Sequence, residues 1–158
     1  MTPISFIARP FMLHKDRSKV QTSILPLSEI RRAVILIDKA EDEYQKAIDD
    51  VTEFFRKKSI DIIILYPGKK DLSFWGRIKR SRRYPDPKDT VEDLLISLYS
   101  ENKFEAEYEV VCSNSRFKIG RYNLGKDIFN IILTDPEDKS LKQWEVFDTV
   151  KDLLEKIN

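Results

Sequence analysis

Two short apolar runs, separated by an amphipathic segment, set the fold of this chain. Residues 33–38 (Ala-Val-Ile-Leu-Ile-Asp) are apolar up to the closing carboxylate, which is typical of a strand covered on both faces, as parallel strands are. Residues 60–66 are rich in β-branched side chains and are followed by Pro67-Gly68, which predicts a second buried strand. We expect residues 33–38 to form the central strand of the sheet.

The segment between the two runs predicts a helix. Apolar side chains recur at helical spacing from Tyr44 to Phe55, and the basic pair Lys57-Lys58 suits the carboxyl end of the helix dipole. Asp42 is placed to cap the amino end. A strand, a helix and a strand in this order form a right-handed βαβ unit, so the two strands are expected to be parallel.

Later segments are less uniform. Residues 93–99 fit a strand or a short helix, and residues 104–112 fit either a half-buried strand or one helical stripe, so periodicity alone does not decide. Residues 116–122 and 129–134 predict strands. The last segment keeps a helical stripe from Leu141 to Ile157, with Ser140 and Gln143 spaced as a capping box.

The expected organisation is an irregular N-terminal arm over residues 1–27 and a single domain over residues 28–158. The arm shows no sustained period, and we expect it to pack onto the domain or onto a partner. A length of 158 residues fits one domain. The fold class is therefore α/β: a three-layer α/β/α domain with a mostly parallel sheet of about five strands, Rossmann-like or flavodoxin-like.

Composition limits the partners. With 28 basic and 27 acidic side chains the net charge is +1. No global field attracts nucleic acid, so we do not expect nucleic acid as a partner. The single Cys112 excludes an intramolecular disulfide, fits a reducing compartment and is expected to be buried. His14 is expected in an exposed loop. We find no signal peptide and no membrane span, and so expect a cytoplasmic protein without a membrane partner.

The sequence predicts no catalytic residue, no cofactor and no metal site. The turn after residue 38 contains no glycine and three acidic residues behind Lys39, so it repels phosphate instead of cradling it. Helix capping explains these acidic residues more simply than a metal does. Neither a nucleotide-binding fingerprint nor a nucleophile elbow occurs.

Two surfaces remain as candidate sites. The first is the carboxyl edge of the sheet, where open α/β sheets take ligands, with the ligand-binding candidates Asp38, Lys39, Tyr66, Tyr99, Ser100 and Asp135. The second is a segment in which basic residues, suited to a nucleic-acid backbone, alternate with aromatic residues, suited to stacking on bases. Its candidates are Trp75, Arg77, Lys79, Arg80, Arg82, Arg83 and Tyr84. For this segment a solvated surface loop is the favoured interpretation.

The order of four segments resembles a known family. Residues 93–99, 115–121, 129–133 and the closing helix resemble small uncharacterised proteins found mainly in Bacteroidetes, which carry F-D-L-L-I-D-L-S and then S-x-A-x-F-K-V-G-R. The resemblance covers residues 30–158 and implies that residues 93–99 form a third parallel strand and residues 105–113 a helix. The chain departs from the pattern at Ser97, where the family usually has an acidic residue, and at Ser115-Arg116.

The same segments are similar, more distantly, to the amino-terminal half of heptosyltransferase-like glycosyltransferases. Those enzymes need a second, nucleotide-sugar-binding domain, so this likeness concerns fold and not activity. The functional expectation is a non-catalytic binding or interaction module, for which a protein partner is compatible. The alternatives are a degenerate glycosyltransferase-like or nucleotide-dependent enzyme domain, and a nucleic-acid accessory protein that uses residues 77–84.

Overall fold

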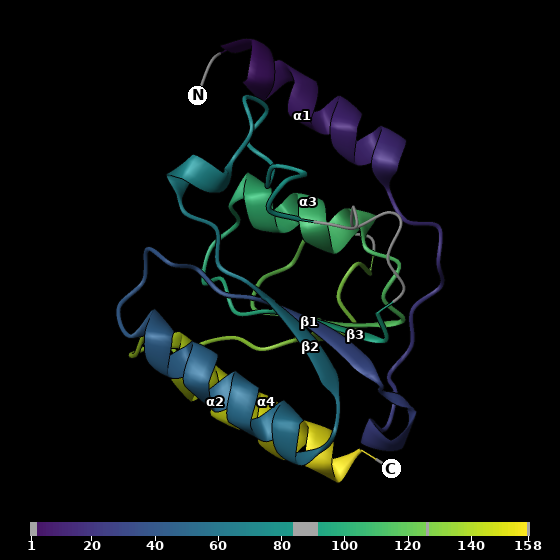
Figure 1. Ribbon diagram of the computed structural model, residues 1–158, viewed down its shortest axis with the longest axis vertical. Coiled ribbons are helices and arrows are strands. Elements are labelled where there is room, and N and C mark those ends of the chain that lie inside the picture. Colours follow the sequence, from purple (N-terminus) through teal and green to yellow (C-terminus); the bar gives the residue numbers. More distant parts are fainter. Residues whose placement is uncertain (1–2, 84–91, 126, 158) are drawn as a thin grey trace.

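The chain folds around a five-stranded, all-parallel sheet in the computed structural model, which describes residues 3–83, 92–125 and 127–157. The strand order is β2-β1-β3-β4-β5, with β1 (Arg32–Leu36), β2 (Asp61–Leu65), β3 (Leu94–Ser97), β4 (Phe117–Gly120) and β5 (Ile131–Ile132). Helices α2 (Tyr44–Lys57) and α4 (Gln143–Lys156) lie on one face and α3 (Phe104–Cys112) on the other (Figure 1). The predicted three-layer α/β class is confirmed.

Strand β1 is an inner strand but not the middle one. It pairs in parallel with β2 on one side and with β3 on the other, so β3 occupies the centre of the five. Strand β2 is an edge strand and is not covered on both faces, because Asp61 and Ile63 are exposed. The prediction of a fully buried second strand is therefore wrong: a short apolar run does not reveal how many neighbours a strand has.

Helix α2 follows β1 as predicted, but it begins differently. The residue before it is Glu43, in the left-handed conformation at φ 59°, and no side chain caps the helix. Asp42 is thus not the cap, since the left-handed residue redirects the chain one position later. The apolar stripe of the helix is buried on the sheet through Ala47, Val51 and Phe55.

Residues 104–112, which fit both periods, form helix α3. Seven of its nine residues are buried, including Glu109, because the sheet covers one side of the helix and another helix covers the other. That double cover explains why neither an apolar stripe nor a strict alternation stands out in the sequence. As the family resemblance implies, residues 94–97 form a parallel strand before this helix.

The N-terminal arm is not irregular throughout. Pro3–Asp16 form helix α1, with Pro10 inside it, which stacks on α3 outside the three layers (Figure 1). Met12 and Leu13 pack against the buried Phe104, Tyr108 and Cys112. The arm therefore packs onto the domain as expected, while its helical structure and the exposed position of His14 near the helix end, instead of in a loop, correct the prediction. Two proline residues within this helix, Pro3 and Pro10, explain why its sequence does not suggest a helix.

The C-terminal part of the chain differs from the prediction in the length of its strand and in the cap of its helix. The strand expected over residues 129–134 is reduced to Ile131–Ile132. Helix α4 begins at Gln143, and the side chain of Glu145 accepts a hydrogen bond from the amide of Lys142 at 3.1 Å. The capping box expected from Ser140 and Gln143 is therefore wrong, because the side chain of Gln143 is engaged elsewhere.

Candidate functional site

The structure places a pocket where the strand order reverses. The chain leaves β1 towards β2 on one side, whereas β3 lies on the other side of β1, and the ends of β1 and β3 are in register at Leu36 and Ser97. Their connections separate towards α2 on one face and α3 on the other, which opens a crevice between them. This switch-point pocket has a volume of about 550 Å³ and is lined by Asp38, Ala40, Glu41, Asp42, Ser100, Glu101, Lys103, Ser140, Leu141 and Lys142.

Three helices begin around this pocket. The turns before α2, α3 and α4 supply its lining, and the residue before each helix is Glu43, Lys103 or Lys142. The partial positive charge at the amino end of a helix stabilises nearby carboxylates. The acidic residues of the pocket therefore stand where the fold favours them.

An ion pair between the buried Asp38 and the partly exposed Lys103 lines the pocket. The Nζ atom of Lys103 lies 2.7 Å from Oδ2 of Asp38, whose side chain is buried, and Oδ1 of Asp38 accepts a hydrogen bond from the amide of Ala40 at 3.0 Å. Burial lowers the pKa of Lys103, but its hydrogen bond with Asp38 and the charge of Asp38 outweigh burial, and the net pKa is raised. The ammonium group of Lys103 is therefore already neutralised by the protein.

The side chain of Gln143 forms two hydrogen bonds with the backbone of Asp38, a residue that lines the pocket. Its Oε1 atom accepts from the amide of Asp38 at 2.8 Å, and its Nε2 atom donates to the carbonyl of Asp38 at 3.0 Å. This double hydrogen bond joins the start of α4 to the end of β1. Gln143 is fully buried, so the connection is shielded from water.

Glu43, the residue before α2, makes a further connection to the start of α4. Its carboxylate pairs with Lys142 and accepts a hydrogen bond from Nε1 of Trp144 at 3.0 Å. The hydrogen bond with Lys142 is the main reason why the pKa of Glu43 is lowered and that of Lys142 raised. Both lysines that line the pocket, Lys103 and Lys142, are thus paired with carboxylates.

The remaining acidic side chains of the pocket have fewer partners. The hydroxyl of Ser100 donates to the carboxylate of Glu41, and Glu101 lies 3.9 Å from Nζ of Lys103. Glu41 and Asp42 form no ion pair within the described ranges 3–83, 92–125 and 127–157. Four carboxylates against two paired ammonium groups give the pocket a net negative lining, which favours a cationic group in a ligand.

The other edge candidates lie outside this pocket. Lys39 extends beside Gly68, after β2. Tyr99 is buried, and burial together with the carboxylates of Glu105 and Asp38 raises its pKa. Asp135 binds Arg121 at 2.9 and 3.0 Å and accepts from the amide of Leu141, behind the pocket wall.

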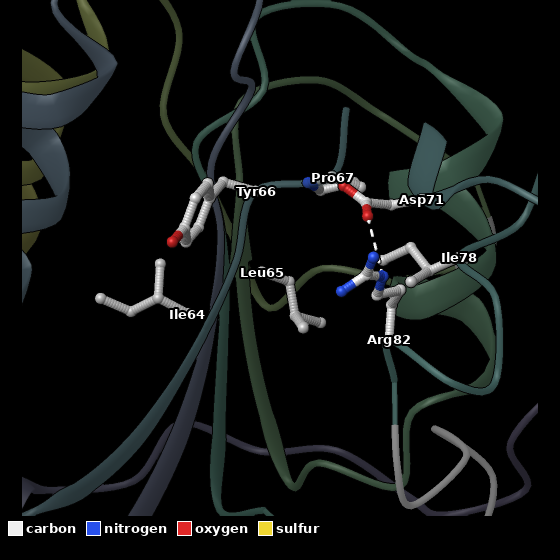
Figure 2. Close-up of a pocket in the computed structure, with 7 residues that line it drawn as sticks. All are labelled: Ile64, Leu65, Tyr66, Pro67, Asp71, Ile78 and Arg82. Atoms are coloured by element: carbon white, nitrogen blue, oxygen red, sulfur yellow. Dashed lines mark ion pairs between the residues drawn. The ribbon is translucent and has the colours of Figure 1, made fainter. Parts of the chain in front are cut away.

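Tyr66 belongs to a different hollow at the end of β2. This edge groove has a volume of about 260 Å³ and is lined by Ile64, Leu65, Tyr66, Pro67, Asp71, Ile78 and Arg82 (Figure 2). Tyr66 is 44% exposed. Of the six edge candidates, the structure therefore brings only Asp38 and Ser100 into the switch-point pocket.

The basic segment is divided between core and surface. Arg83 is only 2% exposed and pairs with Glu92 and Glu109 at 3.5 and 3.2 Å. Arg77 lies 4.1 Å over the ring of Tyr108 and donates to its hydroxyl. Neither side chain is presented to a nucleic-acid backbone.

The other members of that segment are more exposed. Arg82 pairs with Asp71 at 3.2 Å, and Trp75 packs edge-on against Phe74. Lys79 and Arg80 are exposed, while Tyr84 lies outside the described residues. This set of side chains does not form one continuous basic stripe with Arg77 and Arg83.

Sequence reasoning missed Lys103, Lys142 and Gln143. All three stand at or just before a helix start, and the family resemblance implied a helix from residue 105, so the polar residues preceding it were identifiable candidates. The role of Gln143 had no local signal, since its partner lies 105 residues away.

Other chemistry is sparse in the part of the chain that is described. No group of three or more metal-ligating side chains occurs among residues 3–83, 92–125 and 127–157. Cys112 is buried, as expected, and forms no disulfide within these ranges. None of the helices within these ranges has the length and apolar character needed to cross a membrane.

Comparison with known proteins adds a family without an assigned role. A family model described as a family of unknown function matches residues 11–148, which is most of the chain. This confirms the expected membership of such a family. No curated protein and no solved structure matches the chain.

Proposed function

The chain belongs to the family of unknown function DUF6913, and we propose that it is a non-catalytic binding module for a small molecule that carries an amine or guanidinium group. The ligand occupies the switch-point pocket. The observation that carries this proposal is the combination of place and charge: a pocket between β1 and β3 whose lysines are neutralised while Glu41 and Asp42 have no ion pair within the described residues.

The position of the pocket supports a ligand-binding role. Open parallel sheets take ligands in the crevice at the carboxyl ends of the strands where the order reverses, and a volume of about 550 Å³ suits a small molecule. The connections through Gln143 and Glu43 hold the walls in place before any ligand arrives, which reduces the entropy lost on binding.

The charge of the pocket supports the chemical class. A cationic group between Glu41, Asp42 and Glu101 gains charge-assisted hydrogen bonds at the rim. A phosphate would meet the same carboxylates, and Lys103 and Lys142 are already engaged. This arrangement favours a cation over a nucleotide or a nucleotide sugar, so the glycosyltransferase-like alternative is less well supported.

Two further observations bear on the absence of catalysis and on location. The pocket contains neither a histidine nor a cysteine, because His14 lies on α1 and Cys112 is buried under it. We also propose a cytoplasmic location, which a chain with one buried cysteine fits. The nucleic-acid alternative loses Arg83 and Arg77 to internal contacts.

The test is a ligand screen read by thermal unfolding. We expect putrescine, agmatine or arginine to raise the melting temperature, because binding to the folded state alone stabilises it. Phosphate, ATP and UDP-glucose should have no effect. The double variant Glu41→Gln with Asp42→Asn should lose the shift, since it removes the two carboxylates that have no ion pair.

The control keeps the same change of charge elsewhere. Asp49→Asn with Glu53→Gln neutralises two acidic side chains of α2 that do not line the pocket, and it should retain the shift. A shift produced by UDP-glucose but by no amine would transfer the assignment to the enzyme alternative. Equal shifts in both double variants would show that amines act through general charge and not through this pocket.

A further inference from the structure

We propose that a second copy of this chain pairs with the exposed edge of β2, so that two sheets continue across a two-fold axis at Ile63. This inference concerns assembly and is independent of the proposed function. It starts from the backbone of an edge strand whose hydrogen-bonding groups on one side have no partner within the described parts of the chain.

The hydrogen bonds of β2 identify the groups that face outwards. The amide of Asp61 donates to Arg31, and the carbonyl of Leu65 accepts from Ile37. The alternate residues Asp61, Ile63 and Leu65 therefore direct their amides and carbonyls towards β1. Those of Ile62 and Ile64 point away from the sheet, where β2 pairs with no other described strand.

Apart from Asp61 at its start, the side chains of β2 are apolar on both faces. Figure 2 shows Ile64 and Tyr66 on one side of the strand and Leu65, with Ile78 and Arg82, on the other. Ile63 is 38% exposed and Tyr66 44% exposed. Natural edge strands are usually protected by lysine, proline or a bulge, and β2 contains neither lysine nor proline between Asp61 and Leu65.

The strand is complementary to itself in an antiparallel arrangement. With the axis at Ile63, Ile62 lies opposite Ile64 of the second copy, and the two exchange both backbone hydrogen bonds. The two Ile63 side chains then meet in a pair without backbone hydrogen bonds, where side chains are closest. This isologous arrangement closes after two copies and leaves no further edge of the same kind.

Charge complementarity selects the same arrangement. Asp61 is exposed on the face that carries Leu65, and the pairing places it opposite Leu65 of the second copy. Arg82 stands in the groove beside Leu65 with a side chain that is 66% exposed. The carboxylate of Asp61 is thus brought near the guanidinium group of Arg82 in the other copy, which also pairs with its own Asp71. The added strand runs across the mouth of the edge groove.

The test measures the mass of the full chain in solution over a wide concentration series. A pair of five-residue strands makes a small interface, so we expect a concentration-dependent dimer. Ile63→Lys should halve the apparent mass at concentrations where the unchanged chain is dimeric, because two like charges would face each other at the axis. Circular dichroism checks that the variant is folded, as expected for an exposed site.

Matched changes at another exposed apolar residue provide the control. Ile24 is 52% exposed and distant from β2 in sequence, so Ile24→Lys should leave the dimer intact. Under oxidising conditions Ile63→Cys should form a covalent dimer, since the expected spacing of the facing residues suits a disulfide, and Ile24→Cys should not. A chain that is monomeric throughout the series, or a dimer indifferent to Ile63→Lys, would overturn the proposal.

Discussion

The two faces of the sheet bury different chemistry. Between the sheet and helices α2 and α4 lies a large buried apolar cluster that includes Ile35, Phe55 and Phe147. On the α3 face a smaller apolar cluster adjoins buried charges. The α2 and α4 face is called the apolar face below, and the α3 face the charged face. There Arg83 pairs with Glu92 and Glu109, both of them buried, whereas Arg121 on the first face pairs with Asp135, which is partly exposed.

This difference separates two ways of stabilising one sheet. Apolar contact depends on area and shape and is indifferent to pH, whereas a buried ion pair is stable only while every charge keeps its partner. The apolar cluster on the α2 and α4 face should therefore tolerate changes of pH but not of volume, and the α3 face should respond to both. Three measurements compare the two faces.

The largest effect is expected on the charged face, for Arg83→Leu. The change leaves Glu92 and Glu109 without their guanidinium partner and should cost about 3–5 kcal/mol of unfolding free energy. Because buried carboxylates that have lost this guanidinium group take up protons more readily when folded, the loss should shrink as the pH is lowered. Denaturant unfolding at neutral and acidic pH measures both quantities.

Its control is the adjacent arginine. Arg82 pairs with Asp71 at the surface, and Arg82→Leu should change stability by less than about 1 kcal/mol at either pH. Equal losses for the two arginines would contradict the burial of the Arg83 charge.

An intermediate effect is expected from Lys118, whose Nζ atom donates to the carbonyl of Val110 at 2.7 Å. Burial lowers the pKa of Lys118 to about 8, from an ordinary value of 10.5. Between these values the folded chain binds fewer protons than the unfolded chain, so stability rises with pH, by at most about 3 kcal/mol. Lys118→Met should remove this rise.

The measurement is the difference in unfolding free energy between wild type and Lys118→Met from pH 8 to 10.5. Buried tyrosines such as Tyr99 and Tyr122 titrate in both proteins, so their contributions cancel in the difference. A difference that stays constant over this range would show that the ammonium group of Lys118 is well solvated.

The smallest effect is expected on the apolar face, for Val150→Ala. Val150 is fully buried on α4, and loss of its two methyl groups should cost about 2 kcal/mol, including the cavity. The loss should be the same at neutral and acidic pH. Val20→Ala, at a residue that is 43% exposed, should change stability by no more than about 0.5 kcal/mol. A pH-dependent loss at Val150 would remove the contrast between the faces.

The apolar face was predictable because the spacing of apolar residues in the sequence directly indicates which side of each helix is buried. The stripe of α2 and that of α4 each define a buried side, and the runs at residues 33–38 and 60–66 define strands, so their parallel pairing followed. The charged face gave no such signal. Arg83 looked like a surface cation because its partner Glu109 lies 26 residues away, and α3 was ambiguous because it is covered on two sides.

The candidate site was predictable to the level of the sheet edge. Carboxyl ends of parallel strands meet at one edge, which correctly grouped Asp38 with Ser100. The same rule placed Tyr66 and Asp135 too close, because it carries no information on strand order or on where a side chain turns. Strand order in this fold follows from packing between distant segments, and a single sequence does not encode it locally.

The double hydrogen bond from Gln143 to Asp38 also bears on how the protein is made. A ribosome delivers the β1 end long before the residue that fastens it, since the two are 105 positions apart. During synthesis the turn after β1 cannot form these hydrogen bonds, and its carboxylates stay solvated, until α4 has left the ribosome and packed on the sheet. The pocket is therefore among the last features of the molecule to be completed, and a nascent chain should acquire it only after release of the segment that contains Gln143.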